Sequence, residues 1–192
     1  MSMIRHILCA LIVISVLTFP RYSQAETPDT TEGHPNPAVV KTAELVMKTI
    51  DVNELRCLAR NIYFEAGSEP EEGKVAVGLV TLNRRGDSRF SSTICGVINQ
   101  RISAHPHGRA NCQFSWRCVS VRLPNDGQSN WIECQRIATA LLSNDEEYRY
   151  LVRKYRHALY FHTIHVRPVW VRHKERIGRA GSQWFYADSR ST

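Results

Sequence analysis

The chain has 192 residues, of which 43% are hydrophobic and 22% are charged, and its formal net charge at pH 7 is +7. This length suits one domain with a hydrophobic core of its own. Beyond residue 25 no segment is long and apolar enough to cross a bilayer, which excludes stable membrane insertion of that part. The positive charge favours a polyanionic partner through long-range attraction.

The first 25 residues have the layout of a secretory signal peptide. Arg5 and His6 precede an apolar run over residues 7–19, and small residues at 23–25 offer a cleavage site. The apolar run is shorter than the ~20 residues of a membrane-spanning helix, so we predict cleavage rather than anchoring. We therefore expect an exported monomer in the periplasm or cell envelope. The partners available there are the anionic polymers of the envelope and not nucleic acid.

Loss of Cys9 with the signal segment reduces the six cysteines to five, namely Cys57, Cys95, Cys112, Cys118 and Cys134. An oxidising compartment favours disulfides, and an odd count leaves one thiol over. The pairing stays open, although the short loop between Cys112 and Cys118 makes that pair the favoured one. No C-x-x-C spacing occurs, so we expect no bound metal and no other cofactor.

Helical periodicity dominates the first half of the chain after a short linker. Residues 26–37 are rich in Pro, Thr and acidic residues and predict a flexible linker, which leaves residues 38–192 as a single domain. Apolar residues recur with the helical period in four segments, which are 40–50, 52–66, 70–82 and 131–142. Three capping-box pairs mark helix starts, namely Asp51 with Glu54, Ser68 with Glu71, and Asn130 with Glu133.

After about residue 156 the apolar pattern changes to a period of two. The segments HALYFHTIHV (157–166) and SQWFYA (182–187) are typical of strands. Helices followed by strands predict an α+β fold with a mostly helical N-terminal part and a small C-terminal β-sheet.

Glu65 is the residue whose setting asks for an explanation. Leu58, Ile62 and Glu65 fall at i, i+4 and i+7, so the carboxylate points toward the apolar face in the last turn of the helix. Burial disfavours the charged form and raises the pKa, as a general acid working near neutrality requires. The alternative is a structural glutamate that pairs with an arginine such as Arg60 or Arg84, or an exposed residue at the helix end.

Several motifs in order resemble one known family. They are the run CLARNIYFEAGSEPEEGKVAVGLVTLNRRGDSRFSSTICGVINQ (57–100), CQFSWRC (112–118), ALYFHTIHVRPVW (158–170), and IG with WFY (177–186). The chain is similar to the SleB-type cell wall hydrolases, the catalytic domains of spore-cortex-lytic enzymes. The resemblance implies a lysozyme-like, peptidoglycan-cleaving domain related to lytic transglycosylases, in which Glu65 of the YFEA motif is the catalytic acid.

The chain departs from the family pattern at three places. It reads EAGSE where the family often has EARGE, and Val119 and Ser120 follow CQFSWRC where Asp-Gly is usual. Ser182 or Gln183 stands where a histidine is usual. These departures bear on substrate detail more than on the reaction.

Seven further residues are candidates for contacts with the glycan, namely Tyr63, Asn83, Gln113, Ser115, Trp116, His162 and Tyr186. Trp116 could stack on a sugar face, or it could belong to a short core strand with its neighbours. Tyr63 and Asn83 could bind glycan or stabilise the fold, and His162 and Tyr186 are the C-terminal residues best placed to reach the site.

The resulting hypothesis is cleavage of the β-1,4 bond between N-acetylmuramic acid and N-acetylglucosamine in peptidoglycan glycan strands. A lytic transglycosylase needs Glu65 alone, whereas hydrolysis would need a second carboxylate, for which Asp87 and Asp126 are the nearest candidates. One alternative is a metal-dependent amidase or peptidase that uses His157, His162 or His165. A second alternative is a non-catalytic module that binds the envelope.

Overall fold

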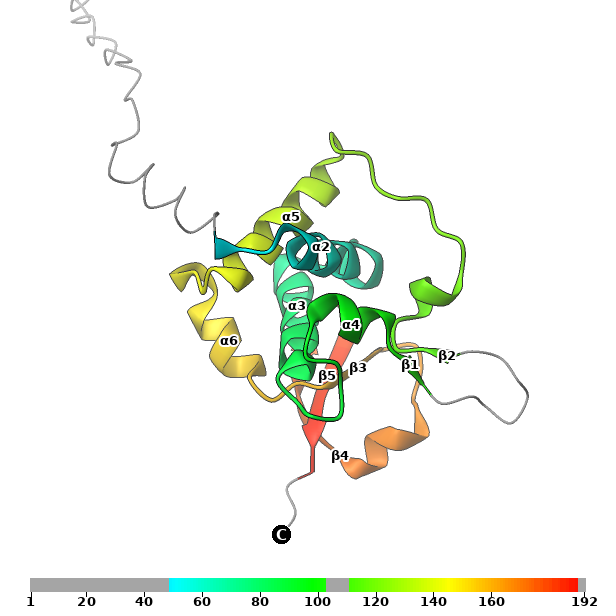
Figure 1. The fold of residues 1–192 in the computed structure, drawn as a ribbon. Helices are drawn as coiled ribbons and strands as arrows, with labels where there is room; N and C mark the ends of the chain where they lie inside the picture. The colour runs from blue at the N-terminus through cyan, green and yellow to red at the C-terminus, as the bar shows by residue number, and fades with distance from the viewer. Residues whose placement is uncertain (1–48, 103–110, 190–192) are drawn as a thin grey trace, which may run out of the picture. The chain divides into compact units, whose positions relative to one another are not determined.

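The computed structural model describes residues 49–102 and 111–189 (Figure 1). The signal segment, the linker and nearly all of the helix expected at 40–50 lie outside these ranges. In the described ranges, no helix combines the length and apolar character of a membrane span.

Five α-helices and five strands follow one another along the described residues. The helices are α2 (Val52–Ala66), α3 (Glu71–Arg85), α4 (Ile94–Asn99), α5 (Ser129–Leu142) and α6 (Arg149–Tyr155). The strands are β1 (Arg101–Ile102), β2 (Asn111–Cys112), β3 (Tyr160–Thr163), β4 (Lys174–Ala180) and β5 (Gln183–Asp188). Three short 3-10 helices are η1 (Ser115–Cys118), η2 (Glu146–Tyr148) and η3 (Val169–His173). The predicted order of a helical N-terminal part and a small C-terminal sheet is confirmed.

Helix α2 begins at the predicted Asp51 cap, but Glu54, the second residue of the predicted capping box, binds another helix. The Asp51 carboxylate accepts hydrogen bonds from the backbone N–H groups of Asn53 (2.7 Å) and Glu54 (3.3 Å). The Glu54 carboxylate accepts instead from the N–H groups of Ile94 (2.5 Å) and Cys95 (3.2 Å), at the start of α4. Glu54 therefore ties the start of α4 to the first turn of α2.

The other two predicted capping boxes are wrong. Helix α3 starts at Glu71 with Pro70 as its N-cap residue, and α5 starts at Ser129 after Gln128, in both cases without a side-chain cap. Pro70 explains why Ser68 does not cap α3. Its fixed φ suits the position directly before the helix, so Ser68 lies outside the capping position.

The core forms where α2, α3 and α5 pack together. Leu58, Ile62, Val77 and Ile137 are fully buried there. Gly78 permits the close approach, since a Cβ atom at this position would lie 2.7 Å from Leu141 Cδ1 and 3.1 Å from Ile62 Cδ1. We therefore expect a larger residue at this position to force the Leu141 and Ile62 side chains to shift.

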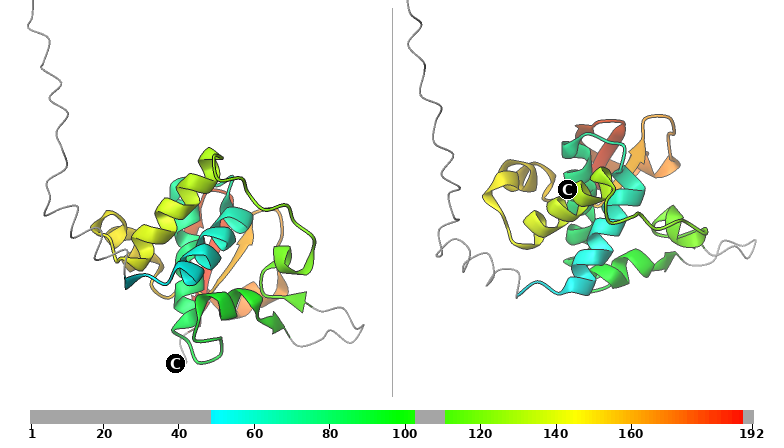
Figure 2. Two further views of the ribbon diagram at one scale, coloured as in Figure 1. Left: turned by 45° about the horizontal axis from the view of Figure 1, so that its top comes forward. Right: turned by 90° about the horizontal axis from the view of Figure 1, so that it is seen from above.

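The C-terminal sheet has the strand order β3-β5-β4 and is antiparallel throughout. Figure 2 shows it beside helix α3 in both views. Strand β3 lies within its predicted segment, and β5 extends one residue beyond its own, to Asp188. Strand β4 was not predicted, because a register shift between Arg176 and Gly178 interrupts its alternation. Side chains alternate across β5, so Gln183 and Phe185 face the helices while Trp184 and Tyr186 face the other side.

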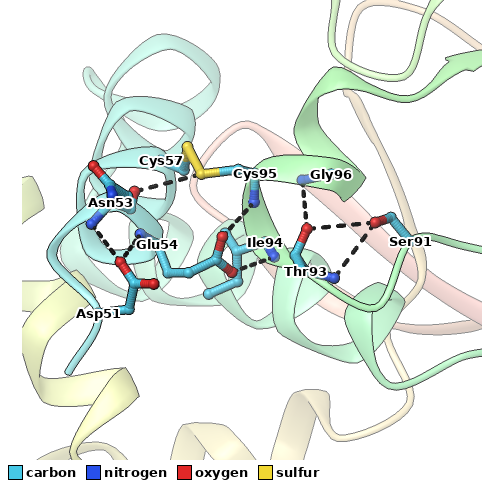
Figure 3. The surroundings of a disulfide bond; sticks show 9 residues. All are labelled: Asp51, Asn53, Glu54, Cys57, Ser91, Thr93, Ile94, Cys95 and Gly96. Carbon is cyan, nitrogen blue, oxygen red and sulfur yellow. Dashed lines mark hydrogen bonds between the residues drawn. A yellow bond between two sulfur atoms is a disulfide. The ribbon is translucent and has the colours of Figure 1, made fainter. Parts of the chain in front are cut away.

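Two disulfides join Cys57 to Cys95 and Cys112 to Cys118, and Cys134 is a buried free thiol. The favoured short-loop pair and the single leftover thiol are thus confirmed. The Cys57–Cys95 bond connects α2 with α4 beside the Glu54 carboxylate (Figure 3). The N-terminal half of α2 is therefore fixed covalently as well as by hydrogen bonds.

Candidate active site

Glu65 lies in the last turn of α2 and is partly buried, as its position on the apolar face predicts. Its Oε1 atom is buried and has no hydrogen-bond partner among the described residues. Burial raises the pKa of Glu65 from its ordinary value of 4.5 to about 7, and the positive charge of Arg84 opposes this shift. The carboxyl group can therefore hold or release a proton near neutral pH.

Arg84 influences Glu65 without pairing with it. Its Nε atom donates a hydrogen bond to the carbonyl of Leu159 (2.8 Å), and its guanidinium lies over the rings of Phe90 (5.3 Å) and Phe114 (5.2 Å). Burial lowers the pKa of Arg84 to about 10. Among the described residues neither Arg84 nor Arg60 forms an ion pair with Glu65, so the alternative of a salt-bridged structural glutamate has no support.

The backbone of Glu65 is held by the first residue of β5. The Nε2 atom of Gln183 donates to the Glu65 carbonyl (2.8 Å), and Gln183 is only 3% exposed. A carbonyl oxygen can only accept, so this contact fixes which end of the amide faces Glu65. Carbonyls in the last turn of a helix lack partners within the helix, and Gln183 supplies one at the site residue itself.

A second contact holds the segment that follows Glu65. The backbone N–H of Ser182 donates to Glu69 Oε2 (2.7 Å), and the Ser182 hydroxyl donates to Glu69 Oε1. Gly181 makes this approach possible with a positive φ of 56° and no Cβ atom to meet the Glu69 carboxylate. The β4–β5 turn therefore holds the chain from Glu65 to Glu69 at two points.

Trp116 supports the same helix from within the core. It is 8% exposed, the Phe64 ring stacks on it at 4.6 Å, and the Arg117 guanidinium lies over it at 5.1 Å. Its Nε1 atom donates to Asn61 Oδ1 (2.9 Å), and Asn61 Nδ2 donates to Thr81 Oγ1 (3.0 Å). This placement favours the alternative that Trp116 belongs to the core, and a sugar-stacking role stays a prediction.

The segment 112–118 does not form the short core strand that was the alternative, because only its first residue, Cys112, lies in β2 and Ser115 begins η1. Ser115 is exposed, and the backbone N–H of Gln113 donates to the Gln100 carbonyl (3.1 Å). The Cys112–Cys118 bond closes this short turn. A sugar-binding role for Ser115 and Gln113 stays a prediction.

Asn83 and Tyr63 have different surroundings. The Nδ2 group of Asn83 donates to the carbonyls of Tyr155 (2.9 Å) and Ala158 (2.9 Å), so both of its N–H groups hold the connection between α6 and β3. These contacts favour the alternative that Asn83 stabilises the fold, and its glycan-binding role stays a prediction. Tyr63 is partly exposed, its hydroxyl donates to Gln128 Oε1 (3.2 Å), and its glycan-binding role stays a prediction.

His162 and Tyr186 lie together on the sheet face opposite Gln183. Their rings stack at 5.3 Å, and His162 Nε2 lies 2.9 Å from the Tyr186 hydroxyl. Because His162 Nδ1 lies 2.8 Å from the Thr163 carbonyl, Nδ1 carries the proton in the neutral ring and Nε2 accepts from Tyr186. Their direct contact with the sugar at Glu65 stays a prediction.

Glu65 is absent from the linings of two hollows on the surface of the described residues. One, of about 830 Å³, lies between the end of α3, α6 and β4 and includes Asp87 and Arg89. The other, of about 470 Å³, lies on the outer face of the sheet and includes His162 and Tyr186. No group of three or more His, Cys, Asp or Glu side chains in residues 49–102 and 111–189 is arranged to hold a metal ion.

A partly buried carboxyl group with a pKa near neutrality, held on the end of a well-packed helix, is the type of group that acid–base enzymes use. A family model for cell wall hydrolases matches residues 68–186, which is more than half of the chain. The chain belongs to the cell wall hydrolase family. Glu65 lies three residues before the matched segment.

Similar proteins include spore cortex-lytic enzymes. That of Bacillus subtilis is 46% identical over 51 residues, which are 27% of this chain and 17% of the relative. That of Halalkalibacterium halodurans is 32% identical over 78 residues, which are 41% of this chain and 23% of the relative. The matched segments thus span less than a quarter of these relatives.

Two solved structures are also similar. The catalytic domain of the germination-specific lytic transglycosylase SleB from Bacillus anthracis shares 24% identity at a TM-score of 0.46, covering 72% of this chain and 97% of that domain. The catalytic domain of the Bacillus cereus SleB protein shares 22% identity at the same TM-score, covering 71% and 91%.

Proposed function

We propose that this protein is an exported glycosidase that cleaves the β-1,4 bond between N-acetylmuramic acid and N-acetylglucosamine in peptidoglycan, with Glu65 as the general acid. The observation that carries the proposal is the partly buried Glu65 carboxyl group, whose pKa of about 7 keeps much of it protonated at neutral pH. Membership in the cell wall hydrolase family supports the choice of polymer. Residues 38–192 would form the catalytic domain, and residues 1–37 the signal peptide and linker.

The reaction starts with Glu65 protonated. Glu65 gives its proton to the O4 atom of the leaving N-acetylglucosamine as the C1–O4 bond breaks and the muramoyl ring gains oxocarbenium character. The Glu65 carboxylate then accepts the proton of the muramoyl C6 hydroxyl while O6 bonds to C1. The products are a free O4 hydroxyl, a 1,6-anhydromuramoyl end and a reprotonated Glu65, without use of water.

The surroundings of the other carboxylates support transglycosylation over hydrolysis. Hydrolysis would need a second free carboxylate, roughly 5 to 9 Å from the first. Asp87 is held by Arg89 at 2.6 Å, and these hydrogen bonds lower the pKa of Asp87 to about 2. Both oxygens of Glu69 accept from Ser182. Asp126 lies in an exposed turn.

The alternatives have less support among the described residues. Two of the three histidines considered for an amidase have different partners, since His157 accepts a hydrogen bond from Arg156 (2.8 Å) and His162 contacts Tyr186. A module that only binds the envelope has no use for a partly buried carboxyl group poised to titrate at neutral pH.

The product of digestion tests the proposal. Purified sacculi digested with residues 26–192 should release muropeptides about 18 Da lighter than the hydrolysed forms, because ring closure replaces the addition of water. These ends should resist borohydride reduction, as they carry no reducing group. Reducible ends that take up labelled oxygen from solvent would show hydrolysis, and released stem peptides would show an amidase.

A further inference from the structure

The segment between β3 and β4, residues 164–173, presents large aliphatic side chains to solvent. Ile164, Val166 and Val169 are 42%, 54% and 76% exposed, and Val169 is the most exposed large hydrophobic residue in the described parts of the chain. A single exposed aliphatic residue is ordinary on a protein surface, whereas several close together in one short segment form an apolar patch. Such a patch calls for a partner that covers it.

The same segment carries positive charge. No Asp or Glu occurs in the chain between Glu147 and Glu175. Arg167 and Arg172 are exposed and form no ion pair within the described parts of the chain. Glu175, the first carboxylate after the segment, follows Lys174 in β4 and therefore points to the other face of that strand. Both guanidinium groups thus remain available to an anionic partner.

The segment is folded onto the sheet. The Trp170 ring contacts the rings of Tyr160 (5.7 Å between centroids) and Tyr186 (5.5 Å), and the Ile164 N–H donates to the Ser182 carbonyl (2.8 Å). Figure 1 shows this part of the chain, drawn in orange, at the rim of the domain. Because these contacts already fix the segment, binding through it costs little further ordering.

The combination of side chains distinguishes between two classes of anionic partner. An anionic polymer strand would engage the arginines but has no apolar layer to receive three aliphatic side chains. The surface of an anionic bilayer receives both, since headgroup phosphates bind Arg and the boundary with the acyl chains takes up aliphatic side chains. The long stem of an arginine lets its charge stay at the headgroups while its neighbours go deeper. The segment therefore fits a lipid surface better than a polymer.

We propose that the segment 164–173 binds the surface of an anionic phospholipid bilayer. Arg167 and Arg172 donate charge-assisted hydrogen bonds to headgroup phosphates, and Ile164, Val166 and Val169 enter the boundary with the acyl chains. The association is peripheral, because the segment is far too short to cross a bilayer. It holds the protein beside a membrane and confines its action to material close to that membrane. This inference goes beyond the proposed glycosidase function and does not rest on it.

Flotation with lipid vesicles tests the apolar part of the proposal. The protein used is residues 26–192, which contain the whole described core and both disulfides. Val166→Ser/Val169→Ser is compared with Val52→Ser/Val119→Ser, which makes the same change at positions that are 61% and 63% exposed. The segment variant should bind vesicles of phosphatidylglycerol mixed with phosphatidylcholine about five-fold or more weakly than its control.

A second pair of variants tests the charged part. Arg167→Gln/Arg172→Gln is compared with Arg56→Gln/Arg122→Gln, which removes the same charge from exposed positions outside the segment. The segment variant should bind the mixed vesicles about ten-fold or more weakly than its control, because each arginine near an anionic surface adds to the attraction. High salt should reduce this difference. Vesicles of phosphatidylcholine alone should bind every variant weakly, and melting temperatures check folding.

Equal binding of the segment variants and their controls to the mixed vesicles, or no binding by the wild type, would overturn the proposal. A loss with the arginine variant and none with the valine variant would also overturn it, because that result assigns the segment to an anionic polymer. The vesicles contain no glycan, so the outcome is independent of whether Glu65 cleaves peptidoglycan.

Discussion

At the residue scale, the sequence was most informative about Glu65. Local helical spacing places it beside Leu58 and Ile62, and the structure confirms that it is partly buried. The pKa of about 7 follows from this burial, with Arg84 near enough to limit the shift. The contacts of its backbone could not be predicted, because Gln183 lies 118 positions away in the chain.

The remaining site residues show the same limit. For Trp116 and Asn83 the sequence left open a contact with the glycan or a role in the fold. Their hydrogen-bond partners lie 55 positions away for Trp116 and 72 and 75 positions away for Asn83. Aromatic and amide side chains serve a core or a cleft equally well, and only the tertiary contacts decide between the two. The one available signal in the sequence was Asn61, a polar residue on the buried side of its helix. Such a residue needs a buried hydrogen-bond partner, which here is Trp116.

The pH profile tests how Glu65 and Gln183 act together. Wild-type activity should be highest below the Glu65 pKa and fall as pH rises through about 7, because the acid must start protonated. Gln183→Leu removes the anchor of the last helical turn, so water should reach the carboxyl group and the pKa should move back toward 4.5. The high-pH limb of sacculus digestion should then shift to lower pH.

The control for this prediction is Gln135→Leu, which makes the same change at an exposed position of α5 and should leave the profile unchanged. A Gln183→Leu enzyme that loses rate equally at every pH would show that Gln183 supports the fold without setting the state of Glu65.

At the element scale, helix α2 is fixed at both ends. The Cys57–Cys95 bond and the Glu54 carboxylate hold its N-terminal half to α4, and Gln183 holds its C-terminal turn. Existence and extent of α2 were predictable from its period and its Asp51 cap. Strand β4 could not be predicted, because a bulge interrupts its alternation. The helices α4 and α6 could not be predicted either, because six or seven residues show too little periodicity.

The two disulfides should contribute unequally to stability. Chain entropy predicts about 4 kcal/mol for the bond whose cysteines are 38 positions apart and about 2 kcal/mol for the bond separated by 6. Cys57→Ser/Cys95→Ser should therefore lower the melting temperature more than Cys112→Ser/Cys118→Ser in thermal unfolding. An equal effect, or no shift of the wild type with reductant, would contradict this assignment.

At the scale of the whole molecule, composition and charge predicted the class of partner, and the order of elements predicted the fold class. The +7 charge suits an anionic polymer, and the helical part followed by a small sheet is confirmed. Export, the signal cleavage and the lysozyme-like arrangement stay predictions. The family match supplies what physical reasoning on one sequence could not, namely membership in the cell wall hydrolase family.

The digestion of purified sacculi by Glu65→Gln tests the central claim most directly. The amide keeps the shape of the side chain and lacks the proton, so turbidity loss should slow by ~100-fold or more while folding and sacculus binding persist. Glu146→Gln changes an exposed glutamate and should digest at the wild-type rate. Digestion by Glu65→Gln at the wild-type rate would contradict the assignment of Glu65 as the acid that cleaves the glycan.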